Sequence, residues 1–180
     1  MVYIRITKDL LRVLINNNYK LWYGRISSDM KKLKQKNDMP FALSKTEIED
    51  ITTQLYLKSM NDDDFMISSI SLSSAFYKYM INKKIEDNEA ISVIEPSLDK
   101  YGAKVSKVIL KVLLFNCFSE YIKCNSIKAV KEVNNISLNL ALDEILYKNQ
   151  LEKDFVLNKT LVVTIFEKHI SSINLEYNEF

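Results

Sequence analysis

Residues that shape tight turns are scarce in this chain. Its 180 residues include two glycines, Gly24 and Gly102, and two prolines, Pro40 and Pro96. Sheet-rich folds need frequent tight turns, and such turns favour residues that tolerate a positive φ angle. The scarcity therefore predicts an all-α fold, in which long helices are joined by few turns.

The residue types on which most catalytic and metal sites depend are also few. His169 is the single histidine, and the two cysteines, Cys117 and Cys124, are seven positions apart. A structural zinc site needs four ligands, and a disulfide framework needs more cysteines in a shorter chain. The sequence has no glycine-rich phosphate loop and no nucleophile elbow. We therefore expect no enzyme, no cofactor and no metal, with both cysteines reduced and buried in the core.

Long apolar runs are missing too. No stretch reaches the roughly 18 apolar residues that a membrane-spanning helix requires. Charged residues follow directly after the first few residues, where a signal peptide would have a sustained apolar run. The sequence thus predicts a protein without a membrane association, located in the cytoplasm.

Basic residues are concentrated at the start of the chain. Residues 1–43 contain nine basic and three acidic residues, whereas the net charge of the whole chain is +2. The charged run at 31–38 reads as a linker closed by Pro40. We therefore predict a basic N-terminal extension over 1–43 and a helical domain over 44–180. A basic segment on a mildly acidic body indicates anionic partners.

Two features of this extension have two interpretations each. The lysines between 31 and 36 either contact a phosphate backbone or belong to a solvated linker. The aromatic residues Tyr19, Trp22 and Tyr23 lie near basic residues, as in proteins that stack on unpaired bases. Packing of the extension onto the body is the interpretation that we favour for these aromatics.

Periodicity predicts the elements along the chain. Alternation over 2–6 indicates a short strand, and a helix from Thr7 is expected to end at the asparagines 16–18. Ser44 and Glu47 form a capping box that opens a helix. The run 62–64 lacks the glycine and glutamate of a calcium loop and is expected to open the next helix.

The second half of the chain is predicted to be mostly helical. A segment at 91–98 is interrupted by Pro96. Residues 105–121 are apolar nearly all round, which places this helix in the middle of a bundle. Ser126 is expected to cap a helix that directs Ile136, Leu140 and Ala141 inward. A last helix is expected over 155–166. Residues 160–165 are rich in β-branched side chains, so a strand remains the alternative for this stretch.

The central helix resembles a known family. Residues 105–115 (VSKVILKVLLF) resemble the helix of NusB-type transcription antitermination factors that reads V-x-K-x-[VI]-L-[RK]-[IV]-A-L-[YF]. Three further segments resemble family motifs in the family's order. They are 53–56 (TQLY, with A-x-Q-A-L-Y in the family), 129–133 (AVKEV, with A-I-N-E-A) and 156–161 (VLNKTL, with F-V-N-x-[VI]-L). The likeness covers residues 44–172.

The chain departs from the family at several positions. The arginine-rich first helix of the family corresponds here to 44–49, with one basic and two acidic residues. Asn116 and Lys131 replace a family acidic residue and a family asparagine. The same fold also serves some rRNA methyltransferases as an N-terminal domain, so a fold alone does not determine the function.

The resemblance implies a NusB-like bundle preceded by the basic extension. Members of the NusB family bind a single-stranded boxA-type RNA together with the ribosomal protein NusE, and the complex keeps RNA polymerase elongating. On this basis the expected RNA-binding residues are Lys31, Lys32, Lys34, Lys36, Lys45 and Tyr56. The expected partner-binding residues are Val156, Leu157 and Asn158, which match the F-V-N element.

The alternative is a helical protein–protein interaction module that does not bind RNA, such as a Bcl-2-like bundle that holds a partner helix. The sequence has no Asn-Trp-Gly-Arg-type groove motif, and Trp22 lies in the extension, which argues against this alternative. A solvent-exposed apolar groove would argue for it.

Overall fold

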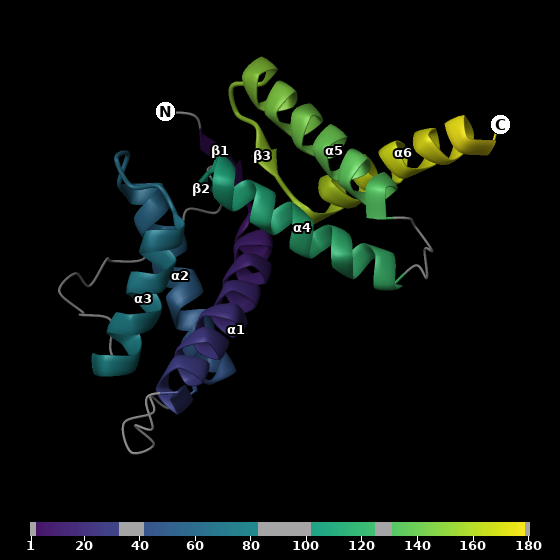
Figure 1. The fold of residues 1–180 in the computed structure, drawn as a ribbon. Coiled ribbons are helices and arrows are strands. Elements are labelled where there is room, and N and C mark those ends of the chain that lie inside the picture. Colours follow the sequence, from purple (N-terminus) through teal and green to yellow (C-terminus); the bar gives the residue numbers. More distant parts are fainter. Residues whose placement is uncertain (1–2, 33–41, 83–101, 125–130, 179–180) are drawn as a thin grey trace.

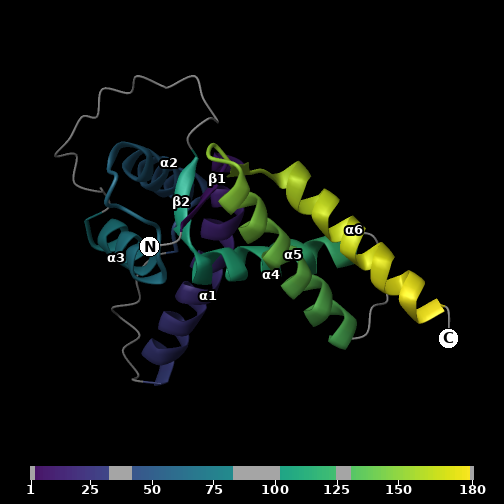
Figure 2. The same cartoon turned by 90° about the horizontal axis from the view of Figure 1, so that it is seen from above.

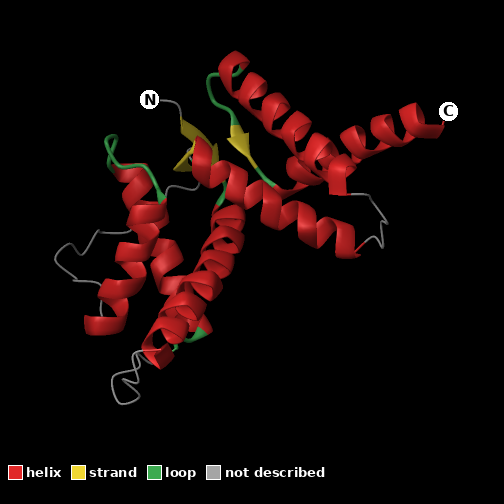
Figure 3. Ribbon diagram, viewed as in Figure 1, coloured by secondary structure: helices red, strands yellow, loops and turns green. Residues whose placement is uncertain are grey.

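The computed structural model describes residues 3–32, 42–82, 102–124 and 131–178. These residues form helices α1 (Lys8–Lys32), α2 (Lys45–Asn61), α3 (Ser69–Asn82), α4 (Lys107–Cys124), α5 (Lys131–Leu151) and α6 (Lys159–Asn178). Three short strands, β1 (Tyr3–Ile6), β2 (Ala103–Ser106) and β3 (Val156–Leu157), complete the described part of the chain. The fold is mostly helical, as Figure 3 shows, and the predicted helical class is confirmed.

The first strand is the centre of a small sheet with the order β2-β1-β3. Strand β1 pairs antiparallel with β2, where Ile4 faces Val105, and parallel with β3, where Ile6 faces Leu157. Ile4 and Ile6 are fully buried. The strand predicted over 2–6 is therefore present, and it joins segments that lie about a hundred and a hundred and fifty positions away.

Helix α1 continues through the asparagines at 16–18, so the expected end of the helix there was wrong. The side-chain amides of Asn16 and Asn18 donate to the carbonyls of Arg12 and Leu14, at 2.9 Å each. These bonds to the preceding turn let the asparagines remain in a helix that they would otherwise disfavour. The apolar face of the helix packs into the core through Leu10, Leu11, Leu14 and Ile15.

The division at residue 43 is not reflected in the packing of the described residues. Strand β1 is the middle strand of the sheet, and α1 packs against α2, α3 and α4. Figure 1 shows α1 between α2 and α3 on one side and α4 on the other. The basic segment thus contributes to the common core, where its apolar stripe is covered, and does not form a separate arm.

An aromatic cluster joins α1 to α3. The ring of Phe76 lies 5.4 Å from that of Tyr19 and 5.5 Å from that of Trp22, between centroids. Tyr23 lies 5.8 Å from Tyr19. Offset and edge-to-face pairs at these distances stabilise a core beyond the burial of area. The favoured interpretation of these aromatics, packing onto the body, is confirmed.

The two ends of α2 match the sequence predictions differently. The Ser44 hydroxyl accepts a hydrogen bond from the Glu47 N–H at 3.2 Å, as the capping box predicted. Residues 62–64 do not open a helix. Asp62 caps the C-terminus of α2, and its side chain accepts the Asp64 N–H at 3.0 Å. The carbonyls of Asp62 and Asp63 accept hydrogen bonds from the Lys104 ammonium. A cation is stabilising at the C-terminal end of a helix, where the helix dipole is negative.

Helix α4 begins later than predicted because Val105 belongs to β2. Strand pairing with Ile4 and a bridge to Ile67 take Val105 into the sheet. The helix buries Ile109, Leu110, Leu113, Leu114 and Phe118, but it leaves Val108 and Phe115 exposed. The helix therefore has one buried and one exposed side and lies at the edge of the core. The prediction of a helix enclosed on all sides was wrong.

The last two helices complete the fold beside α4. Helix α5 buries Ala141 as predicted, whereas Ile136 and Leu140 are exposed and the inward placement expected for them was wrong. Residues 160–165 are helical, and β3 precedes them. Ser126 and the segment 91–98 with Pro96 lie outside the described residues. Figure 2 shows α5 and α6 side by side, with α4 passing beneath them toward α1.

Within the described ranges, none of the helices has the length and apolarity that crossing a membrane requires.

Candidate functional site: a polar cleft between three helices

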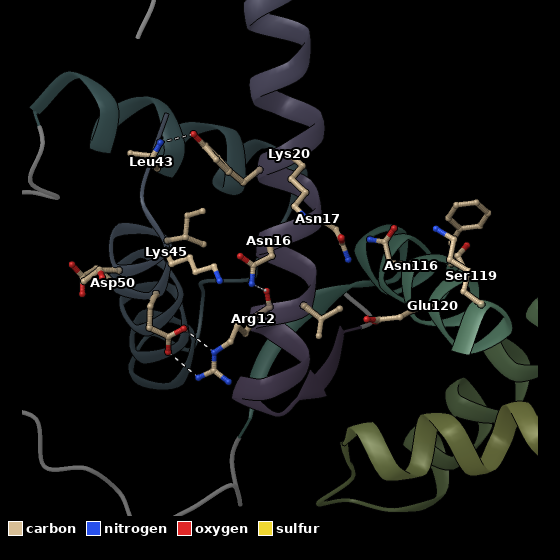
Figure 4. A pocket seen from close by; sticks show the side chains of 17 residues that line it. Arg12, Asn16, Asn17, Lys20, Leu43, Lys45, Asp50, Asn116, Ser119 and Glu120 are labelled. Atoms are coloured by element: carbon tan, nitrogen blue, oxygen red, sulfur yellow. Dashed lines mark hydrogen bonds and ion pairs between the residues drawn. The ribbon is translucent and has the colours of Figure 1, made fainter. Parts of the chain in front are cut away.

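A cleft of about 1270 Å³ lies between α1, the start of α2 and the second half of α4 (Figure 4). Its walls come from residues 12–20, 43–50 and 115–123. The three segments are far apart in the sequence, and the packing of α1 against α2 and α4 brings them together. Most of the residues that line the cleft are polar or charged, although apolar atoms contribute more than half of its exposed surface.

The α1 wall follows from helical spacing. Arg12, Asn16 and Lys20 are four residues apart and therefore form one ridge along the helix. Asn17 lies beside this ridge, and Lys20 is exposed at its end. Together with Asn17, the ridge presents two amides and two cationic groups to the cleft (Figure 4).

Arg12 closes one end of the cleft through an ion pair with α2. Its Nε and Nη2 atoms donate to the two carboxylate oxygens of Glu49 at 2.7 and 2.8 Å, and its Nη1 atom donates to Asp9 at 2.6 Å. The hydrogen bond to Glu49 raises the pKa of Arg12, and the same bond lowers the pKa of Glu49. Both groups are thus charged at neutral pH, and the pair neutralises itself.

Tyr19 fixes the segment that leads into α2. Its hydroxyl accepts the Leu43 N–H at 2.7 Å, and Leu43 lines the cleft. Burial raises the pKa of Tyr19, so the hydroxyl remains protonated at neutral pH. This bond holds the start of α2, with Lys45 exposed on it, against α1.

The α4 wall consists of Phe115, Asn116, Ser119, Glu120 and Lys123. The side chain of Phe115 is unusually open for an aromatic residue, with 59% of its surface exposed. The Nδ2 atom of Asn116 is buried and has no hydrogen-bond acceptor among the described residues. A buried donor without an acceptor costs about 1–3 kcal/mol.

Lysines from three helices surround this cleft. Lys20 belongs to α1, Lys45 to α2 and Lys123 to α4, and all three are exposed. The opposing carboxylates of the lining, after the pairing of Glu49 with Arg12, are Asp50 and Glu120. Asp50 accepts a hydrogen bond from the Tyr79 hydroxyl at 3.2 Å. The balance of the lining is therefore slightly positive.

The structure brings one of the predicted RNA-binding residues, Lys45, into the cleft. Lys31 and Lys32 end α1, and their side chains, like Lys34 and Lys36, lie outside the described part of the chain. Tyr56 is 9% exposed and packs in the core with the rest of the buried face of α2. Its expected place on an RNA-binding surface is therefore not supported.

The three predicted partner-binding residues have mainly structural roles. Leu157 is fully buried in β3, and Val156 is half-buried beside Gly102. Asn158 is exposed, and its side-chain oxygen accepts the Leu161 N–H at 2.8 Å, which caps α6. Of the three, Asn158 presents the most surface to a partner.

Several cleft residues were missed in the sequence. Ser119, Glu120 and Lys123 follow Asn116 by three, four and seven positions, and the four residues form a polar stripe on a mostly apolar helix. This spacing is a local signal that could have revealed the α4 wall. Asn16, Asn17 and Lys20 gave no such signal, because the asparagines read as the end of a helix.

The cleft is suited to binding through charge, amide hydrogen bonds and stacking. The described residues contain no group of three or more histidine, cysteine or acidic side chains that could hold a metal. His169 lies outside the cleft, where its Nε2 atom is 2.6 Å from a carboxylate oxygen of Glu144. The sequence contains no local signal for this pair, because 25 positions separate the two residues.

No family model, no curated protein and no solved structure matches this chain.

Proposed function

We propose that the protein binds single-stranded RNA in the polar cleft and performs no chemistry on it. The observation that carries the proposal is the placement of Lys20, Lys45 and Lys123, from three different helices, around one cleft that also exposes Phe115. Proteins that bind single strands combine cationic groups for the phosphates with aromatic rings for the bases. Side-chain amides add hydrogen bonds to the edges of unpaired bases.

The lysine run at 31–36 adds positive charge close to the cleft residues in the sequence. Lys31 and Lys32 end α1, which forms one wall of the cleft, and Lys34 and Lys36 come between α1 and Leu43, which lines it. An RNA strand that leaves the cleft toward these lysines would gain further phosphate contacts. Such contacts contribute affinity without regard to sequence, whereas the bases are read inside the cleft.

The step from RNA binding to transcription antitermination rests on the sequence resemblance to NusB-type factors. In this proposal the RNA is a boxA-like element, the protein partner is the ribosomal protein NusE, and the complex acts in the cytoplasm on an elongating RNA polymerase. Asn158, exposed at the start of α6, supports a partner contact in the segment that resembles the F-V-N element.

Fluorescence anisotropy with a boxA-like RNA and a scrambled RNA tests the proposal, with and without NusE and at several salt concentrations. We expect tighter binding to the boxA-like RNA and a further gain with NusE. Each phosphate contact contributes about 0.7 to the salt slope for single strands, so replacing Lys20, Lys45 and Lys123 by alanine should lower the slope by about 2. Phe115→Ala should weaken binding by about 1–3 kcal/mol for one stacked base.

A matched variant controls for charge. Lys78, Lys111 and Lys153 are exposed lysines that do not line the cleft, and their replacement by alanine removes the same charge. We expect the affinity of this control to stay close to that of the unaltered protein. Equal losses in the two triple variants would contradict a role for the cleft, and equal binding to both RNAs would contradict boxA recognition.

A second observation favours the alternative class, a helical interaction module. A groove of about 530 Å³ lies between α1 and α3, lined by Trp22, Ile26, Ile70, Tyr77 and three serines. Ile70 is 82% exposed and Tyr77 is 59% exposed. The walls of this groove, residues 19–28 and α3, contain basic residues and no carboxylate.

These features fit an amphipathic partner helix with acidic flanks. A synthetic helix with a leucine stripe and flanking glutamates is the probe for this groove. Ile70→Glu should abolish its binding, while Val108→Glu, at an exposed position on α4, should not. Equal binding by both variants would rule out the groove. If the protein binds the synthetic helix and does not bind RNA, the alternative is favoured over the first proposal.

A further inference from the structure

Helix α5 exposes four large apolar side chains along one line. Ile136, Leu140, Tyr147 and Leu151 are 44%, 39%, 61% and 65% exposed. Their separations of four, seven and four residues place them within an arc of roughly 60° at the helical period. Single exposed apolar residues are ordinary on a protein surface, but four that are aligned on one side of a helix indicate an interface.

The opposite side of α5 accounts for its packing within the chain. Ser137, Ala141, Leu142 and Ile145 are buried, and α5 packs against α6 and α4 through this side. Figure 2 shows α5 along the outside of the molecule, with α6 beside it. The exposed line is therefore directed away from the body of the same chain.

The spacing of the exposed line is the same when read from either end. Its midpoint lies between Asp143 and Glu144. When α5 packs antiparallel on a second α5 about a two-fold axis through this point, Ile136 faces Leu151 of the partner subunit. Leu140 then faces Tyr147 of the partner subunit. A self-complementary patch of this kind is the requirement of an isologous dimer, and an unrelated partner helix would not require the symmetry.

Two acidic residues flank the midpoint of the line, on opposite sides of it. The two-fold axis places Asp143 opposite Asp143 of the partner subunit, and Glu144 opposite Glu144 of the partner subunit. Each Glu144 already binds the Lys168 ammonium at 3.2 Å and the His169 ring at 2.6 Å within its own chain. The facing Asp143 carboxylates repel each other, which agrees with a weak contact.

We propose that α5 forms an antiparallel, two-fold symmetric contact with α5 of a second copy of this chain. The proposal is independent of RNA binding in the cleft, which α5 does not line. The helix has 21 residues, so the contact is at most about 31 Å long. One helix pair of this length buries less than the roughly 1,200–2,000 Å² of a standard interface, and we therefore expect a weak, concentration-dependent dimer.

Sedimentation velocity over a wide range of protein concentrations tests for the dimer. We expect the sedimentation coefficient of the full chain to rise toward that of a dimer, and Leu140→Glu to remain a monomer throughout. Val108→Glu on α4 adds the same charge at an exposed position outside the line and should dimerise normally. A monomer at every concentration, or equal behaviour of the two variants, would overturn the proposal. Far-UV circular dichroism confirms that each variant is folded.

Disulfide trapping tests the direction of pairing independently of stability. In a chain whose exposed Cys124 is replaced by serine, Leu140→Cys protein is mixed with Tyr147→Cys protein and oxidised. The antiparallel contact predicts a Leu140→Cys to Tyr147→Cys cross-link. Two Leu140→Cys chains should not cross-link, because seven residues, about 10 Å of helix, separate their positions, beyond the roughly 7 Å limit for a disulfide. A dominant link between two Leu140→Cys chains would indicate parallel pairing and overturn the proposal.

Discussion

Replacing Gly102 by alanine should destabilise the protein more than its small size suggests. Gly102 has a φ angle of 53°, in the left-handed region that L-residues with a Cβ disfavour. A Cβ at this position would lie 2.8 Å from the Ile6 carbonyl oxygen, 3.0 Å from Val156 Cγ1 and 3.2 Å from Arg5 Cβ. The nearest of these atoms belongs to the backbone of the central strand, so relief requires a shift of β1 against its neighbours.

The two contributions can be estimated separately. The left-handed conformation costs about 1–2 kcal/mol for a residue with a Cβ. Displacing a packed strand costs about 1–3 kcal/mol, as overpacking does in other cores. A loss of about 3 kcal/mol corresponds to a fall in Tm of roughly 6–12 °C for a chain of this size.

The assay is thermal and urea unfolding followed by circular dichroism at the helical signal. Gly24 is the matched control, because it lies inside α1 and nothing lies within 4 Å of the place its Cβ would take. Gly24→Ala should therefore stabilise the chain by about 0.5–1 kcal/mol through helix propensity. Surface substitutions change the free energy of unfolding by up to about 0.5 kcal/mol. If the free energy of unfolding of Gly102→Ala differed from that of the unaltered protein by no more than this, the sheet contact of residue 102 described above would be wrong.

Three further predictions concern other parts of the fold. Glu49→Gln should cost about 1 kcal/mol at neutral pH, because the bidentate pair with Arg12 is partly exposed to solvent. Since the folded pKa of Glu49 lies below its ordinary value of 4.5, the pair is fully formed above that pH and is lost as the pH falls through the folded pKa. Unfolding experiments should therefore show the difference between the two proteins shrinking below pH 4.5, and a constant difference would refute the assignment. A thiol reagent at mildly alkaline pH should modify exposed Cys124 quickly and Cys117 slowly, because burial raises the pKa of Cys117 to about 11; equal rates would contradict the structure. Phe76→Ala should cost about 3–5 kcal/mol in the same unfolding assays, because the ring is buried against α1, and a loss below 1 kcal/mol would contradict the described aromatic cluster.

The features that sequence reasoning predicted well are local ones. The helical class follows from the scarcity of turn residues, and the capping box at Ser44 depends on an interaction over three positions. The strand at 2–6 shows its alternation within five residues. In each case the residues that determine the structure are neighbours in the sequence, so the pattern contains the physical cause.

The features that were missed depend on partners far along the chain. Val105 continues an apolar helical pattern, but pairing with Ile4 takes it into a strand. Residues 62–64 have the composition of a helix start, but the ammonium of Lys104, about forty positions away, is held by two of their carbonyls. Local propensity is a weak term beside such tertiary contacts, and it was overridden at both places.

Charge in the sequence pointed to only part of the proposed site, for the same reason. The lysines at 31–36 form a run that is visible in the sequence, whereas Lys20, Lys45 and Lys123 are isolated residues on three helices. Only the packing of α1 against α2 and α4 places those three around one cleft. The electrostatic attraction of a flexible anionic strand depends on where charges lie in space, and three lysines around a cleft with an exposed aromatic ring can hold such a strand in one register. A run of lysines in the sequence adds attraction without a fixed register, so under the proposed function any sequence preference should depend on the cleft and the general affinity on the run.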